Sequence, residues 1–174
     1  TQADIDEFNS YLAENQSVLQ IAIDEPLTEY QALRALMLPS GNNIADALAT
    51  WAFGSVDNYL DYANAKATAW GLTETHFADA SGFSPKTVSS AQDLVMLGEH
   101  VYDNPVLADI VSQEEVTLPV AGTVYNVNSL LGQENIIGIK TGNTDEAGGC
   151  FLFATKNNID GKETSNRKKT KDEN

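Results

Sequence analysis

Hydrophobic residues recur at helical spacing through the first two thirds of the chain and at strand spacing in the last third. Ile5, Phe8 and Leu12 predict an amphipathic helix over residues 4–16, and residues 17–23 form a short apolar run that we expect to be extended. Further helices are predicted over 28–38, 43–53, 55–70 and 90–101, with a short helical turn after Pro105. In the 43–53 helix, Ile44, Leu48 and Trp51 fall in register on one side.

Helix boundaries are marked by capping residues and by residues that break helices. Thr28 and Gln31 have the spacing of a capping box, and Pro39 ends the helix that follows because the residue before a proline avoids helical geometry. Gly54 and Gly71 suit the left-handed position just past a helix end. The strongly turn-forming stretch 74–83 is predicted to be a loop.

Beyond Gln113 the period changes to that of strands. The runs "EVTLPV" and "TVYNV" flank Ala121-Gly122 and predict a β-hairpin, while "NIIGIKTG" and "GGCFLFAT" predict a second antiparallel pair. Helices first and strands last indicate the α+β class. We expect a domain over 1–156, helical to about residue 112 and then β, and a polar tail over 157–174 that is disordered or a chain end.

Length, charge and composition exclude several classes of partner and site. The 174 residues carry a formal charge of −15, suit one globular domain, and contain no run apolar enough to span a bilayer. Residues 1–161 hold five basic and 22 acidic residues, a formal charge of −17, which repels nucleic acid and anionic membranes. A single cysteine, Cys150, and two separated histidines, His76 and His100, predict neither a metal site nor a cofactor.

Two tripeptides are candidates for chemistry. Ser40-Gly41-Asn42 follows a proline and precedes a helix, where such residues are common as turn and capping groups. Lys140-Thr141-Gly142 ends a predicted strand, and strand alternation places Gly138, Lys140 and Gly142 on one face. Glycines beside a lysine leave space for a ligand, and an extended peptide could pair with the strand.

With its flanking sequence, this pair of motifs resembles the serine-type D-alanyl-D-alanine carboxypeptidases, the low-molecular-mass penicillin-binding proteins. Their S-x-N and K-T-G motifs match positions 40–42 and 140–142. The stretches "LTEYQALRALMLPSGNNIADALA", "NAKATAWGLTETHFADASGF", "SSAQDLVMLGEHV" and "IIGIKTGNTDEAGGCFLFAT" are similar to the family's in order and spacing. The resemblance runs from about Leu27 to Thr155 and implies the incomplete transpeptidase fold shared by β-lactamases and penicillin-binding proteins.

The resemblance implies a role for each matched position. Ser40 would relay a proton to the leaving amine, Asn42 would hold the substrate backbone and orient a lysine, and Lys140 would supply positive charge. Substrate binding would fall to Thr141, Gly142, Asn143 and Thr144. The implied partners are peptidoglycan stem peptides ending in D-Ala-D-Ala and β-lactam inhibitors, and the implied location is outside the cytoplasmic membrane.

The family's nucleophile motif, S-x-x-K, has no match before Ser40. One S-x-x-K occurs at Ser165–Lys168, in the polar tail, and we interpret it as coincidence. We therefore expect a fragment of a carboxypeptidase whose nucleophile is encoded outside this chain, inactive by itself. The alternatives are a non-catalytic peptidoglycan-binding or remnant domain, and a related β-lactamase or D,D-endopeptidase.

Overall fold

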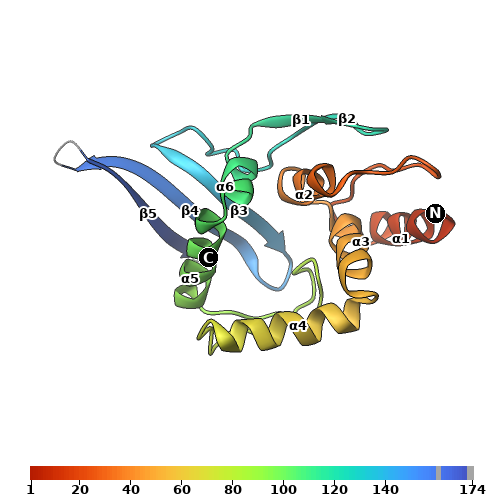
Figure 1. Cartoon of the computed structure of the whole chain (residues 1–174), viewed down its shortest axis with the longest axis horizontal. Coiled ribbons are helices and arrows are strands. Elements are labelled where there is room, and N and C mark those ends of the chain that lie inside the picture. Colours follow the sequence, from red (N-terminus) through yellow and green to blue (C-terminus); the bar gives the residue numbers. More distant parts are fainter. Residues whose placement is uncertain (160–161, 172–174) are drawn as a thin grey trace.

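Helices occupy the N-terminal part of the chain. The structure, a computed structural model, describes residues 1–159 and 162–171, with side chains described through Asn157. Figure 1 shows the helices arranged around one side of a curved sheet. The helices are α1 (Gln2–Ala13), α2 (Glu29–Met37), α3 (Asn42–Phe53), α4 (Val56–Ala69), α5 (Ala91–Asp103) and α6 (Pro105–Val111).

Local sequence accounts for where these helices begin and end. The predicted capping box is confirmed: the Gln31 backbone N–H donates to the Thr28 hydroxyl, and the Thr28 N–H donates to the Gln31 side chain. The Ser55 hydroxyl caps α4 by accepting from the Asn58 N–H. Gly54 ends α3 at φ +83°, a left-handed conformation that glycine adopts without steric cost.

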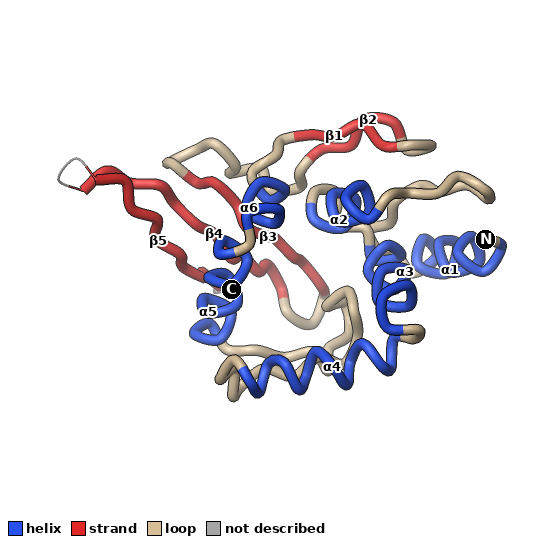
Figure 2. Tube along the Cα trace, viewed as in Figure 1, coloured by secondary structure: helices blue, strands red, loops and turns tan. Residues whose placement is uncertain are grey.

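The strands form two antiparallel sheets. A small sheet pairs β1 (Glu115–Leu118) with β2 (Gly122–Tyr125), as predicted for a hairpin. The larger sheet has the order β3 (Ile136–Thr144), β4 (Gly148–Ile159), β5 (Lys162–Lys171). Figure 2 shows the two sheets as separate sets of strands. The predicted α+β class is confirmed, with helices preceding strands along the chain.

The polar C-terminal stretch differs from our expectation of a tail. Residues Lys162–Lys171 form β5, which pairs with β4 from Ile159 back to Cys150. Backbone hydrogen bonds along a long neighbouring strand stabilise a segment whose side chains show no strand pattern, because the ladder does not depend on side-chain identity. Residues 160–161 and 172–174 of the predicted tail lie outside the described residues.

Two clusters of buried residues form the core, and α6 belongs to both. The first cluster joins α2, α3 and the β1–β2 hairpin, and Leu38 and Ile110 are fully buried within it. The second joins α6 to the larger sheet through Val111, Ile139 and Ala154. Because consecutive residues of one short helix enter different clusters, α6 fixes the first cluster relative to the sheet.

Two residues on the apolar sides of their helices lie on the surface. Leu12 of α1 is 53% exposed, and α1 contains no buried residue. Trp51 of α3 is 68% exposed, although it shares the spacing of Ile44 and Leu48. Helical periodicity identifies the apolar side of a helix, but the width of the packed face depends on which neighbours cover it.

Close packing between β3 and the helices depends on two glycines. A Cβ at Gly98 of α5 would lie 3.0 Å from Ile139 Cδ1, and one at Gly138 would lie 2.9 Å from both Tyr102 Oη and Val111 Cγ2. Gly138 also has φ +147°, a conformation that other residues rarely adopt. The larger sheet therefore approaches α5 and α6 more closely than side chains at these positions would allow.

We expect Gly138→Ala to destabilise the protein by about 1–3 kcal/mol, because the new methyl group overlaps Tyr102 and Val111 and the backbone is strained. Urea unfolding followed by circular dichroism measures the change. Gly142→Ala is the matched control on the same strand, since a Cβ there meets nothing within 4 Å. Equal stability of the two variants would contradict this account of the packing.

Candidate functional site

Ser40 and Gly41 lie in the short connection between α2 and α3, and Asn42 is the first residue of α3. Ser40 has φ +62°, so it occupies the left-handed region that non-glycine residues adopt uncommonly. Gly41 is buried, and a Cβ there would lie 3.1 Å from the Ala35 carbonyl oxygen and 3.2 Å from Ile44 Cγ1. The backbone around Ser40 is therefore held by packing, and the residue is half-buried.

Asn42 and Asn43 attach the start of α3 to the segment that follows α1. The Asn42 side-chain amide donates to Gln16 Oε1 at 2.7 Å, and its backbone N–H donates to the Ser17 carbonyl at 2.8 Å. Asn43 is buried and exchanges two hydrogen bonds with the backbone of Leu19. Asn42 thus has a fixed position, with Gln16 as the partner of its amide.

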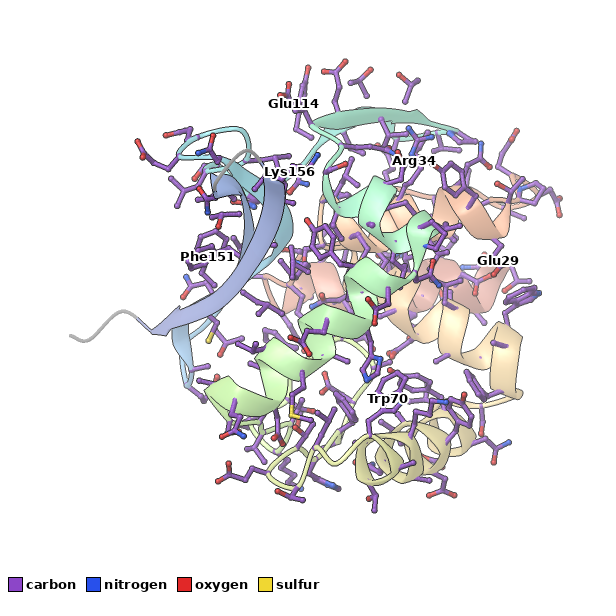
Figure 3. The ribbon with its side chains drawn as sticks, turned by 60° about the vertical axis from the view of Figure 1, so that its left-hand side comes forward. Glu29, Arg34, Trp70, Glu114, Phe151 and Lys156 are labelled. Atoms are coloured by element: carbon purple, nitrogen blue, oxygen red, sulfur yellow. The ribbon has the colours of Figure 1, made fainter. Side chains whose placement is uncertain are left out.

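Lys140 lies in the middle of β3, opposite Leu152 of β4. Opposed residues of antiparallel strands point to the same face, and Leu152 faces α5, where its methyl carbons lie 3.6 Å from a Cβ at Gly98. The Lys140 side chain therefore starts on the helix-facing side of the sheet. Figure 3 shows Phe151, the residue before Leu152 in β4, on the side of the sheet turned away from α5.

Gly138, Lys140 and Gly142, which strand alternation predicts on one face of β3, pair with residues 154, 152 and 150 of β4. The two glycines differ in their surroundings: Gly142 is open, whereas the space at Gly138 is filled by Tyr102 and Val111. Ile139 also reaches α5, contrary to the alternation, next to an irregularity in register between residues 136 and 138. Free space beside Lys140 therefore exists only toward Gly142.

Burial changes the acidity of Lys140. Loss of water around its ammonium group lowers the pKa of Lys140 from 10.5 to about 8. Its Nζ donates to the carbonyl oxygen of Thr141 at 2.6 Å. The group is thus a partly dehydrated cation at neutral pH, and such a cation attracts a carboxylate more strongly than a fully solvated lysine does.

The residues after Lys140 follow the exposed end of β3. Thr141 is half-buried, and Gly142 and Asn143 are exposed. The Thr144 hydroxyl accepts from the Ala147 N–H at 3.0 Å, so this side chain stabilises the turn into β4. In the described sheet β3 is an edge strand, because β4 pairs with it on one side only.

The S-x-N and K-T-G motifs lie on different parts of the fold, and α6 connects those parts. Helix α6 packs against α2 on one side and against β3 on the other. In the view of Figure 1, the C-terminal end of β3 points toward α3. Among the described side chains of residues 1–157, no hydrogen bond joins Ser40 or Asn42 to Lys140. Their convergence on one pocket stays a prediction.

Other sequence expectations concern features outside this pair of motifs. Ser165–Lys168, the S-x-x-K of the C-terminal stretch, lies within β5 rather than at the start of a helix. Within the described part of the chain, no group of three or more acidic, histidine or cysteine side chains is arranged to hold a metal ion. The helices of that part are too short or too polar to cross a membrane.

Sequence reasoning missed the residues that hold the motifs in place. Gln16 follows a helix end and gives no signal that it contacts Asn42, 26 positions away. Tyr102 lies on a predicted helix, yet its hydroxyl donates to the Ile137 carbonyl at 2.8 Å and so anchors β3. Gly98 interrupts an apolar helix face, which is the one local signal that another element packs closely there.

Comparison with known proteins identifies the family. The sequence pattern of the family described as D-alanyl-D-alanine carboxypeptidase matches residues 4–162. The chain belongs to this family.

Individual relatives agree with that assignment. D-alanyl-D-alanine carboxypeptidase DacA of Escherichia coli is 36% identical over 122 residues, which are 68% of this chain and 30% of DacA. A D-alanyl-D-alanine endopeptidase of Pseudomonas aeruginosa is 29% identical over 143 residues, 78% of this chain and 46% of that protein. The crystal structure of the Streptomyces K15 DD-transpeptidase superimposes with a TM-score of 0.85 at 27% identity, covering 98% of this chain and 70% of that one.

We expect the Lys140 ammonium to titrate near pH 8, because burial disfavours its charged form. NMR of the chain with 13C-labelled lysine side chains measures this, and the signal should be missing in Lys140→Met. The folded pKa is depressed, so stability should rise as the pH increases from about 8 to about 10.4, where only the unfolded chain keeps the proton. A Lys140 signal that titrates above pH 10 would contradict the burial.

Proposed function

We propose that this chain provides the S-x-N and K-T-G elements of a serine-type D-Ala-D-Ala carboxypeptidase that trims peptidoglycan stem peptides. Lys140 carries the proposal: a partly dehydrated ammonium group on an edge strand, followed by an open glycine, suits the carboxylate end of an extended peptide. Family membership supports the reaction type. The S-x-x-K nucleophile is supplied by residues outside these 174.

Substrate binding follows from the edge of β3. An extended peptide pairs with the strand. Its terminal carboxylate forms an ion pair with the Lys140 ammonium group and accepts a hydrogen bond from the Thr141 hydroxyl. Gly142 leaves room for the last D-alanine, since a Cβ there meets no neighbour. Asn143 and Thr144 contribute backbone groups, because the Thr144 hydroxyl is occupied by the turn.

The reaction is acyl transfer to a serine. The nucleophile's oxygen attacks the carbonyl carbon of the penultimate D-alanine, the C–N bond to the last D-alanine breaks, and the leaving amine takes a proton through Ser40. A backbone N–H after Gly142 and the nucleophile's own N–H stabilise the oxyanion. Asn42 holds the substrate backbone. Water then hydrolyses the ester and releases the shortened peptide, and β-lactams acylate the same serine.

A D,D-endopeptidase uses the same chemistry on a cross-linked peptide and is the second candidate, supported by the similarity to the P. aeruginosa endopeptidase. Gly142 and Asn143 are exposed at the end of β3, which suits a longer peptide as well as a terminal residue. We place the site outside the cytoplasmic membrane, where peptidoglycan is found. Release of free D-alanine from a pentapeptide, compared with cleavage of a cross-linked dimer, separates the two activities.

We expect the 174-residue chain alone to form no covalent adduct with fluorescent penicillin, because it lacks the nucleophile motif ahead of Ser40. A chimera that adds a relative's S-x-x-K segment before Thr1 should be labelled, and its Ser→Ala variant at the motif should not. Gel fluorescence and mass spectrometry of the intact protein measure the adduct. A penicillin adduct on any serine of the isolated chain would overturn this assignment of the nucleophile.

In the same chimera, Ser40→Ala and Lys140→Ala should each slow acylation by about 10²–10⁴-fold, the range lost when a proton-transfer or charge-stabilising group is removed. Ser10→Ala and Lys86→Ala are matched controls, since both side chains are exposed outside the motifs. Stopped-flow acylation rates, with circular dichroism to verify folding, measure the effect. Rates within about twofold of the parent for either motif variant would remove that residue from the mechanism.

A further inference from the structure

A groove runs over the helical end of the molecule, away from β3. Its larger hollow, of about 630 Å³, lies between α1, the segment before α2, and α3. A smaller hollow of about 240 Å³ lies between α2, α3 and the start of α4. Glu29, Leu48 and Trp51 line both hollows, which therefore adjoin. Figure 1 shows α1, α2 and α3 grouped on the opposite side of the molecule from β4 and β5.

The walls of the groove are mainly apolar. Ile21, Leu27 and Ile44 line the larger hollow, and Leu33 and Phe53 line the smaller one. Two adjoining apolar hollows suit a ligand with two separated hydrophobic anchors, as in the docking of amphipathic segments into grooves. The size of the larger hollow is in the range that holds several side chains.

Trp51 lines both hollows, and its ring is accessible to a ligand. It is 68% exposed. Two other aromatic rings already have a cationic side chain over them. Arg34 Cζ lies 5.2 Å from the centre of the Tyr30 ring, and Lys66 Nζ lies 5.0 Å from the centre of the Trp70 ring. Among the described side chains, none places a cation over Trp51. Tryptophan is the aromatic residue that attracts cations most strongly.

The charged side chains that line the groove are all negative. The larger hollow is lined by four carboxylates, those of Asp4, Asp24, Glu25 and Glu29, and the lining of neither hollow includes a lysine or an arginine. Asp4 pairs with the Thr1 amino group at 2.6 Å, and within residues 1–157 the other three carboxylates form no ion pair. Apolar walls beside uncompensated negative charge concentrate the field and favour a cationic ligand.

We propose that this groove binds an amphipathic, positively charged peptide segment of another protein. Apolar anchors of the segment enter the two hollows, and a lysine or arginine between them lies over Trp51 and beside Glu29. A second copy of this chain is disfavoured as the occupant because residues 1–161 carry a formal charge of −17. The groove uses no residue of the S-x-N or K-T-G motifs, so this binding and the proposed catalysis are tested separately.

The probe is a synthetic peptide about twelve residues long, with leucines on one helical face and lysines on the other, labelled for fluorescence anisotropy. The full chain should bind it with an affinity that falls as salt is added. Trp51→Ala and Glu29→Gln should each weaken binding by about tenfold. Tyr125→Ala and Glu99→Gln are matched controls on exposed positions of β2 and α5, and their affinities should stay within about twofold.

Five results would overturn the proposal. The first is absence of binding at about 1 mM chain. The second is equal binding of a peptide with glutamates in place of the lysines, and the third is equal loss in the control variants, which indicates attraction to net charge alone. The fourth is a dimer in sedimentation that Trp51→Ala disrupts, which assigns the groove to a second copy. Binding of lysine amide as tight as that of the peptide would likewise overturn it in favour of a small cation.

Discussion

Helix α6 holds together the parts of the molecule that carry the S-x-N and K-T-G motifs, and the geometry of any site between them depends on its packing. Ile110 is fully buried against α2 and the hairpin, while Val111, the next residue, is buried against the larger sheet. Val111 approaches β3 closely because position 138 lacks a side chain. A displacement of α6 would therefore move Lys140 relative to Ser40 without altering either motif.

The supports around each motif have different physical origins. Ser40 is fixed by steric packing around Gly41 and by hydrogen bonds of its neighbours to residues 16–19. Lys140 is fixed by the backbone ladder of β3 with β4 and by Tyr102, which holds the Ile137 carbonyl. The first support is local to α2 and α3, whereas the second extends across the sheet. Pre-organisation of this kind is what catalysis by charge stabilisation requires.

The sequence predicted most of the local structure, because capping boxes, glycine stops and strand alternation act over a few residues. Thr28 with Gln31, Gly54, and the hairpin about Ala121 are examples that the structure confirms. It also identified the two motifs as candidates. The exposure of Trp51 and the strand at Lys162–Lys171 were not predicted, because both depend on neighbours distant in sequence. For the same reason, nothing local indicated that Gln16 contacts Asn42.

The net charge of the chain sets a constraint on how Lys140 would bind the anionic peptide that we propose as its ligand. A chain with a formal charge of −15 repels a carboxylate at long range, so electrostatic steering does not assist the approach of such a ligand. Recognition must then come from contacts at separations shorter than the screening length of the salt. Burial of the ammonium group favours this, because a partly dehydrated cation interacts more strongly with a carboxylate that reaches it. The same burial lowers the pKa of Lys140 to about 8, which keeps the side chain mostly charged at neutral pH. Further burial would remove the charge on which the interaction depends.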